Sequence, residues 1–120
     1  MEKRVVITGL GAMTPIGNTV EEFWKGIKSN KCGIDKITEF DTENYKVKLA
    51  GEVKGFNPEE YFDKRSSKRL DRFSQFAIVA SKEAKEDSGI PPENTDMTRV
   101  GVIISSGIGG LGTIERENAN

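Results

Sequence analysis

The segment spanning residues 67–88 is the feature that most constrains how this chain folds. Apolar side chains recur along it at the spacing of one helical face, and further apolar residues widen that face. The recurring residues are Leu70, Phe73, Ala77, Ala80 and Ala84, and the widening residues are Phe76, Ile78 and Val79. Gly89, followed by two prolines, predicts the end of this helix. So broad an apolar face needs cover on more than one side, which favours a layered fold.

Two apolar runs predict buried strands. One covers Arg4 to Thr8 and contains "VVI"; the other covers Arg99 to Ser106, "RVGVIISS". Because apolar residues follow one another in these runs rather than alternate with polar ones, both faces of each strand are expected to be covered. A weaker strand is predicted over residues 49–53. These strands would form the sheet on which the helices pack.

The remaining signals are local. Thr19 followed by Glu22 forms a capping box, so a helix is predicted from Thr19 to Ser29, with Trp24 in the core. Asn57 followed by a proline predicts a helical turn, and Thr113 is a plausible cap for a last helix. The order of strand, helix, irregular segment, long helix and strand indicates an α/β fold with a helix-covered sheet.

The glycines in "VVITGLGAMTPIG" invite comparison with a nucleotide-binding loop. In a dinucleotide fold the glycine turn leads directly into a helix, whose free N–H groups hold the pyrophosphate. Here the position of the third glycine is Thr14, and Pro15 biases Thr14 away from helical angles. The stretch also contains no lysine, so it lacks the lysine of the other phosphate-binding loop. We therefore expect an irregular loop after the first strand rather than a nucleotide site.

Composition excludes several classes of function. The 18 basic and 19 acidic residues nearly cancel, so no overall charge favours nucleic acid or a membrane surface. The apolar runs are far shorter than the roughly 20 residues that span a bilayer, and a cytoplasmic location is expected. A single cysteine, Cys32, and no histidine make a zinc site improbable. No Ser-His-Asp or Cys-His pair can be completed within these residues.

Three blocks of the chain together resemble the N-terminal part of the β-ketoacyl-acyl-carrier-protein synthases, most closely the type II elongation enzymes of bacterial fatty acid synthesis. The blocks are "VVITGLGAMTPIGNTVEEFW", "FDTENYKVKLAGEVKGFNPEEYFDKRSSKRLDRFSQFA" and "GVIISSGIGGLGTIE". The resemblance implies a thiolase-like layered α/β fold, with helices packed on a mixed β-sheet. Residues 1–120 would be the N-terminal portion of the synthase domain and would supply only part of the first half of this fold. The complete enzyme would be a homodimer.

The resemblance also implies the chemistry. A cysteine thiolate takes an acyl chain from acyl carrier protein, and malonyl-carrier protein loses CO2 to give the carbanion that attacks this thioester. Two histidines assist, and no cofactor is needed. A reactive cysteine is typically placed at a helix N-terminus, whereas Cys32 follows the predicted end of a helix, where the dipole opposes a thiolate. We therefore expect no catalytic residue in this chain and no activity from the chain alone.

Two sites are expected within these residues. The stretch "DKRSSKRLDR", residues 63–72, gathers basic side chains at the predicted start of the long helix, where the helix dipole disfavours them. From composition alone a solvated helix face explains them. The resemblance implies instead that Arg65, Lys68 and Arg69 dock the acidic carrier protein. It also implies that Ile108, in the glycine-rich stretch "GIGGLG", lies beside the acyl channel and controls which chain lengths enter.

Alternatives remain open at this point. A polyketide ketosynthase has the same fold, and so does a chain-length-factor-like partner, which lacks the nucleophile and acts by pairing with an active subunit. A small binding module that uses only the basic residues would require this chain to fold by itself. The broad apolar face of residues 67–88 argues against that last reading.

Overall fold

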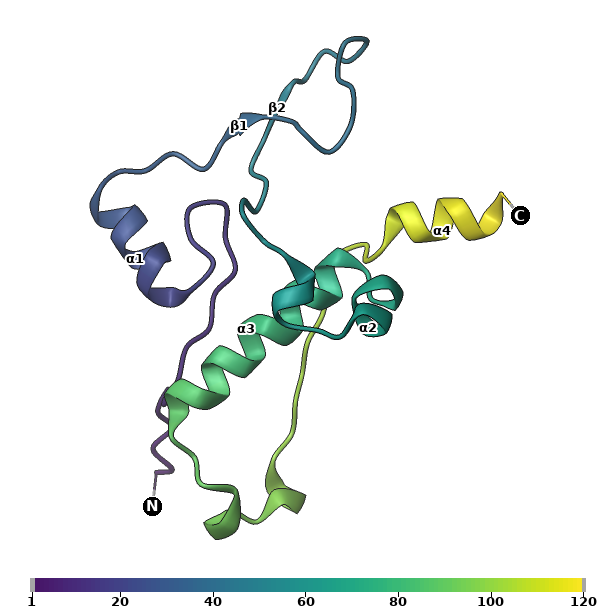
Figure 1. The fold of residues 1–120 in the computed structure, drawn as a ribbon. Helices are drawn as coiled ribbons and strands as arrows, with labels where there is room; N and C mark the ends of the chain where they lie inside the picture. The colour runs from purple at the N-terminus through teal and green to yellow at the C-terminus, as the bar shows by residue number, and fades with distance from the viewer. Residues whose placement is uncertain (1, 120) are drawn as a thin grey trace. The chain divides into compact units, whose positions relative to one another are not determined.

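The computed structural model describes residues 2–119 of the chain. The chain divides into two compact units, whose residues can be found in Figure 1 from the colour bar. One unit comprises residues 12–56, and the other comprises residues 2–11 together with 57–119. The segment that is predicted to be the first strand therefore belongs with the long helix rather than with the helix that follows it in sequence.

The unit of residues 12–56 contains helix α1, Val20–Lys28. The Glu22 N–H donates to Thr19 Oγ1 at 3.2 Å, and the Glu22 carboxylate accepts from the Asn18 N–H at 2.8 Å. The capping box is thus confirmed, with its returning bond made one residue earlier than usual. Trp24 is expected in the core, but its side chain is 56% exposed, so this prediction was wrong for the described residues.

A short hairpin completes this unit. Strands β1, Asp35–Lys36, and β2, Leu49–Ala50, pair antiparallel, with Asp35 opposite Ala50 and Lys36 opposite Leu49. The predicted strand at 49–53 is therefore confirmed over its first two residues. This pair is the one sheet among residues 2–119, so the structure is mostly helical.

The second unit contains the other helices in chain order. These are the 3-10 turn η1 (Pro58–Glu60), helices α2 (Lys64–Arg69) and α3 (Arg72–Ser88), the 3-10 turns η2 (Pro92–Asn94) and η3 (Met97–Arg99), and helix α4 (Leu111–Asn118). The turn predicted at Asn57 is confirmed, since the Asn57 side chain caps η1. Gly89 ends α3 with a φ of 61°, a left-handed conformation that glycine adopts without steric cost. Helix α4 begins after Gly110, so Thr113 lies inside it and does not cap it.

The long apolar segment is two helices rather than one. Leu70 and Asp71 have extended backbone angles, so α2 ends and α3 begins at this point. The prediction of one continuous helix was wrong here because Leu70 lies at the spacing of the apolar stripe, which therefore runs through the break. Aspartate is a favoured residue at the start of a helix, and Asp71 supplies the one local signal for the break.

Both segments predicted as central strands are extended but unpaired. Residues 4–8 and 99–106 contain no strand, and Ile7 is 82% and Ile103 97% exposed. A strand is defined by hydrogen bonds to a neighbouring strand. Among residues 2–119 neither segment has such a neighbour, so the expected helix-covered mixed sheet does not form. The α/β class predicted from these runs is therefore not seen in the described residues.

The glycines that follow the first extended segment nevertheless lie against α3. A Cβ built on Gly9 or Gly11 would collide with the α3 backbone at Ala84 or Ala80, so these glycines permit the chain to approach the helix closely. The Leu10 N–H donates to the Asp87 carboxylate at 2.9 Å. The first glycines of the sequence thus have a packing role against a helix.

Candidate functional site

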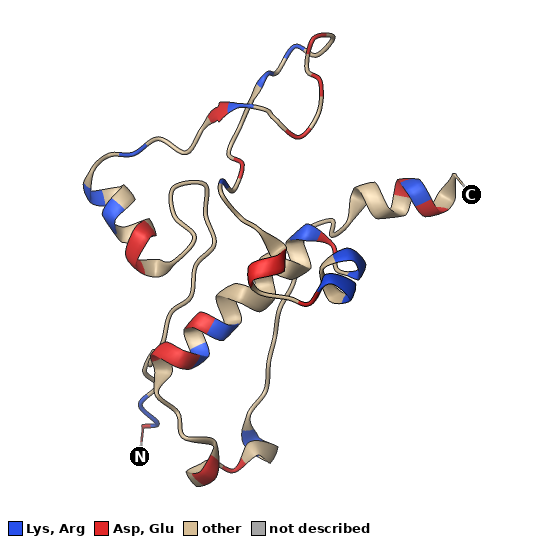
Figure 2. Cartoon of the chain, viewed as in Figure 1, with Lys and Arg blue, Asp and Glu red and all other residues tan. Residues whose placement is uncertain are grey.

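The basic face is formed by Arg65, Lys68 and Arg69 on α2. Residues three and four apart are neighbours on a helix surface, so these side chains share one face. All three are exposed, and none of them forms an ion pair with another described residue. Figure 2 shows α2 as a concentration of basic residues. The structure therefore brings the predicted docking residues together on one short helix.

The position of the basic face within its helix differs from the prediction. Lys68 and Arg69 lie in the last turn of α2, where the dipole favours cations, rather than at the start of the long helix. The prediction that the dipole disfavours them was therefore wrong for these two residues. At the other end Asp63 accepts from the N–H groups of Arg65 and Ser66 at 2.9 and 3.0 Å. Hydrogen bonds from the Ser66 N–H and hydroxyl lower the pKa of Asp63.

A buried glutamine fixes α2 against α3. Gln75 is only 4% exposed, and its side-chain amide donates to the carbonyl oxygens of Ser67 and Leu70 at 2.8 and 3.1 Å. These carbonyls lie at the C-terminal end of α2, where helical carbonyls lack partners within the helix. The sequence interpretation missed Gln75. The sequence feature that could have revealed its role is that Gln75 is a single polar residue next to Phe76 within an otherwise apolar helix face.

Ile108 lies in a loop that joins the second extended segment to α4. Its side chain is 73% exposed, and glycines precede and follow it. Gly109 has a φ of 76°, a backbone conformation in which a residue with a side chain would be strained. The Gly109 N–H donates to Ser106 Oγ at 2.9 Å, which closes the loop locally. Because this side chain is mostly exposed among the described residues, its predicted role as an acyl-channel gate stays a prediction.

Cys32 lies after α1 and is exposed, with its Sγ 3.7 Å from the carbonyl oxygen of Ile34. No helix begins at this residue, and the chain contains no histidine that could act as its base. Within residues 2–119 no group of histidine, cysteine, aspartate and glutamate side chains could hold a metal ion. In the same part of the chain no helix is long and apolar enough to cross a membrane.

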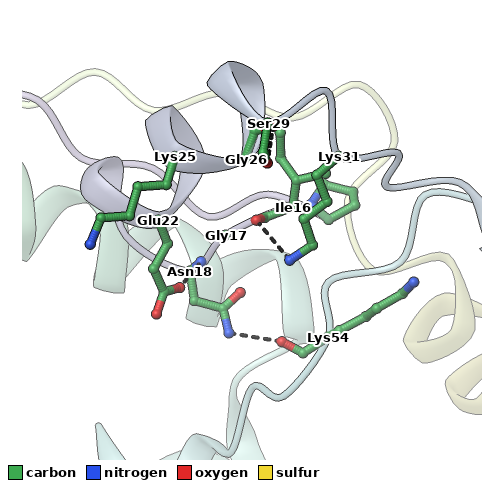
Figure 3. Close-up of a pocket in the computed structure, with 10 residues that line it drawn as sticks. Ile16, Gly17, Asn18, Glu22, Lys25, Gly26, Ser29, Lys31 and Lys54 are labelled. Carbon is green, nitrogen blue, oxygen red and sulfur yellow. Dashed lines mark hydrogen bonds between the residues drawn. The ribbon is translucent and has the colours of Figure 1, made fainter.

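A pocket of about 500 Å³ in the unit of residues 12–56 borders α1 and was not predicted from sequence (Figure 3). Three lysines line it, but each is already engaged. Lys25 pairs with Glu21 at 2.7 Å, Lys54 pairs with Asp35 at 3.1 Å, and Lys31 donates to the Ile16 carbonyl at 3.2 Å. The Lys31 contact ties the segment after α1 to the loop before it, and the carboxylates of Glu21 and Asp35 balance the charges of the other two lysines.

The sequence of the chain matches one protein family and is similar to several known proteins. Residues 2–120 match the family model described as "Beta-ketoacyl synthase, N-terminal domain". A 3-oxoacyl-[acyl-carrier-protein] synthase 2 of Staphylococcus aureus is 52% identical over 94% of this chain, which covers 27% of that protein. The protein of the same name from Vibrio cholerae is 46% identical over 95% of this chain, which covers 28% of it.

A solved structure described as "The ishigamide ketosynthase/chain length factor" also resembles the chain. It matches with a TM-score of 0.65 and 32% identity, over 74% of this chain and 22% of that one. The chain therefore spans little more than a quarter of the length of the two synthases, and the match covers less of the ketosynthase structure. Since the family model covers all described residues, the chain belongs to the β-ketoacyl synthase family and carries its N-terminal domain sequence.

Proposed function

We propose that this chain is the opening part of a 3-oxoacyl-acyl-carrier-protein synthase of the elongation type, acting in fatty acid synthesis. The observation that carries the proposal is the 52% identity to a 3-oxoacyl-[acyl-carrier-protein] synthase 2, which extends over 94% of the chain. In the complete enzyme the reaction would be a decarboxylative Claisen condensation. Malonyl-carrier protein would lose CO2, and the resulting carbanion would displace the thiolate from an acyl-cysteine thioester.

The role of this chain in that reaction is to recognise substrates. The basic face on α2 would receive the acidic acyl carrier protein, because its cations are exposed and unpaired among the described residues. A local positive surface on a chain with a net charge of -1 attracts an acidic partner by steering rather than by overall charge. Ile108 would border the acyl channel and limit the length of the acyl chain that enters.

The reacting groups would come from outside these residues. A condensing enzyme of this kind needs a nucleophilic cysteine and histidine helpers, and the 120 residues contain no histidine. Cys32 lies at the C-terminal side of α1, where the helix dipole disfavours a thiolate. We expect the isolated chain to transfer no acyl group, and the complete enzyme to work as a homodimer in the cytoplasm without a cofactor.

The second candidate is a ketosynthase or chain-length-factor subunit of a polyketide pathway. It is favoured by the similarity to the ishigamide ketosynthase/chain length factor structure. A chain-length-factor-like subunit would have the same N-terminal region but no reactive cysteine. The basic face and Ile108 are compatible with either enzyme, so residues 2–119 do not separate these candidates.

Assay of the complete gene product tests the proposal. The source gene would be expressed in full, and the protein incubated with acyl- and malonyl-carrier protein, with the products identified by mass spectrometry. We expect one round of chain extension by two carbons, and covalent acylation of a cysteine other than Cys32. A full-length protein that pairs with an active ketosynthase but is never acylated itself would establish the chain-length-factor role instead.

A further inference from the structure

Asp71 occupies the N-cap position of α3 but does not use its side chain there. Its backbone angles, φ −62° and ψ 151°, are those of a helix cap, yet the carboxylate makes no bond to the first turn of α3. The carboxylate accepts instead from Thr113 Oγ1, 42 residues further along the chain. A residue that local sequence rules assign to helix capping therefore makes a long-range contact with α4.

The contact places one carboxylate at the N-terminal ends of two helices. Neither α3 nor α4 carries an acidic residue in its first turn. Helix N-terminal ends carry partial positive charge, and a nearby carboxylate is stabilised by them. The single negative charge of Asp71 is thus placed to hold the start of α4 beside the start of α3.

The glycine-rich loop fits closely around this carboxylate. A Cβ built on Gly110 would collide with the Asp71 carboxylate, so glycine at this position leaves room for the carboxylate where it lies. One residue earlier, a Cβ on Gly109 would lie 3.5 Å from Cζ of the Phe73 ring. Asp71 and Phe73, at the start of α3, therefore lie close against the end of the loop that carries Ile108.

We infer that Asp71 is a positioning residue, which fixes the 106–110 loop and, through it, the place of Ile108. A role of Asp71 in substrate specificity rests on the proposed function of Ile108, whereas its role in positioning the loop does not. Asp71 also directly follows Leu70, whose carbonyl oxygen accepts from Gln75. The C-terminal end of α2 and the end of the 106–110 loop are thus held by contacts to two neighbouring residues, Leu70 and Asp71.

A spin label at position 108 tests the loop directly. In the complete enzyme a spin-labelled non-natural amino acid replaces Ile108, whose side chain is exposed among the described residues, so that Cys32 and the proposed reactive cysteine stay unlabelled. Asp71→Asn and Thr113→Val each weaken or remove the contact, while Thr113→Ser keeps the hydroxyl. A hydrogen bond to a charged group contributes roughly 1.5–3 kcal/mol, so we expect a mobile population about 10- to 100-fold larger in Thr113→Val.

The controls separate this contact from a general loss of charge. Asp41→Asn removes a carboxylate in the other unit and should leave the spectrum unchanged. Thr113→Ser should restore the immobile spectrum, and the double variant Asp71→Asn with Thr113→Val should be no more mobile than the worse single variant. An immobile label in both Asp71→Asn and Thr113→Val would overturn the inference.

Primer selectivity provides the second readout in the complete enzyme. With the loop loosened by Asp71→Asn, the ratio of kcat/KM for long and short acyl primers should change at least about threefold, since a methylene in an apolar pocket is worth about 10-fold or more. The KM for the carrier protein should not change. If Ile108→Phe leaves selectivity unchanged while Asp71→Asn mobilises the label, the gate proposal fails and the positioning of the loop stands.

Discussion

Reversing the charge of the basic face is the sharpest test of carrier-protein docking. Lys68→Glu and Arg69→Glu together replace two exposed cations on α2 with two anions. The double variant should raise the KM for acyl carrier protein, because the new carboxylates repel the acidic partner that the lysine and arginine attracted. Turnover of a small acyl thioester, which has no acidic protein surface, should be unchanged.

The size of the effect follows from the exposure of these side chains. An exposed ion pair contributes roughly 0.2–1 kcal/mol, and a reversal removes an attraction and adds a repulsion of similar size. Two reversals should therefore weaken docking by about 2 kcal/mol, which corresponds to a rise in KM of roughly 30-fold. The neutral pair Lys68→Gln and Arg69→Gln should give about half of this free energy, or a rise of roughly fivefold.

The assay compares both substrates in the complete enzyme at low and high salt. The charge-matched control is Lys28→Glu with Lys46→Glu, two exposed lysines in the unit of residues 12–56. Its KM for the carrier protein should remain within about threefold of the parent value. At 1 M salt the Debye length falls to about 3 Å, so the difference between parent and variant should nearly vanish.

Two results would refute the reasoning about the basic face. If the small thioester loses as much activity as the carrier-protein substrate, the substitutions have damaged the fold rather than the docking surface. This is a real risk because acidic residues at the end of α2 oppose its dipole, and circular dichroism of the variants monitors it. If the control pair raises KM as much as the test pair, overall charge and not this helix face controls binding.

Three further predictions test other parts of the chain. Ile108→Phe should lower kcat/KM for long acyl primers at least about tenfold relative to short ones, measured by competition between primers. Gly11→Val should destabilise the protein by several kcal/mol, measured by chemical denaturation, because its side chain would collide with the α3 backbone at Ala80. Hydrogen bonds lower the pKa of Asp63 from 3.8, so its charged side chain caps α2 at neutral pH, and this cap is lost as the pH falls below 3.8 towards the lowered pKa. The NMR shift of the Ser66 amide should follow the loss of the cap, and Asp63→Asn should abolish this pH dependence.

Most helix caps and stops, which depend on neighbouring residues in sequence, were predicted correctly, whereas Thr113 was wrongly expected to cap the last helix. Thr19 caps α1, Asn57 caps η1 and Gly89 ends α3, because each of these signals acts within one helical turn. The grouping of basic residues on one exposed face was also apparent from sequence, although their place in the helix was not. The break before Asp71 was missed because apolar spacing continued through it.

Features that depend on distant residues were not predictable in the same way. The two central strands were inferred from apolar runs, but a strand forms only when another strand supplies its hydrogen bonds, and no described residue does so. The prediction that Trp24 is buried failed for the same reason, because periodicity shows which face of a helix is apolar but not what covers that face. The contact between Asp71 and Thr113 joins residues 42 positions apart, and neither neighbourhood signals it.

The unpaired segment at residues 102–104 is open to pairing with other extended chains. Val102, Ile103 and Ile104 are 78%, 97% and 55% exposed, and they are β-branched residues without a proline or a charge among them. Short segments of this composition stack into cross-β fibrils when many copies meet. A charge within the segment, as in Ile103→Lys, would oppose this stacking.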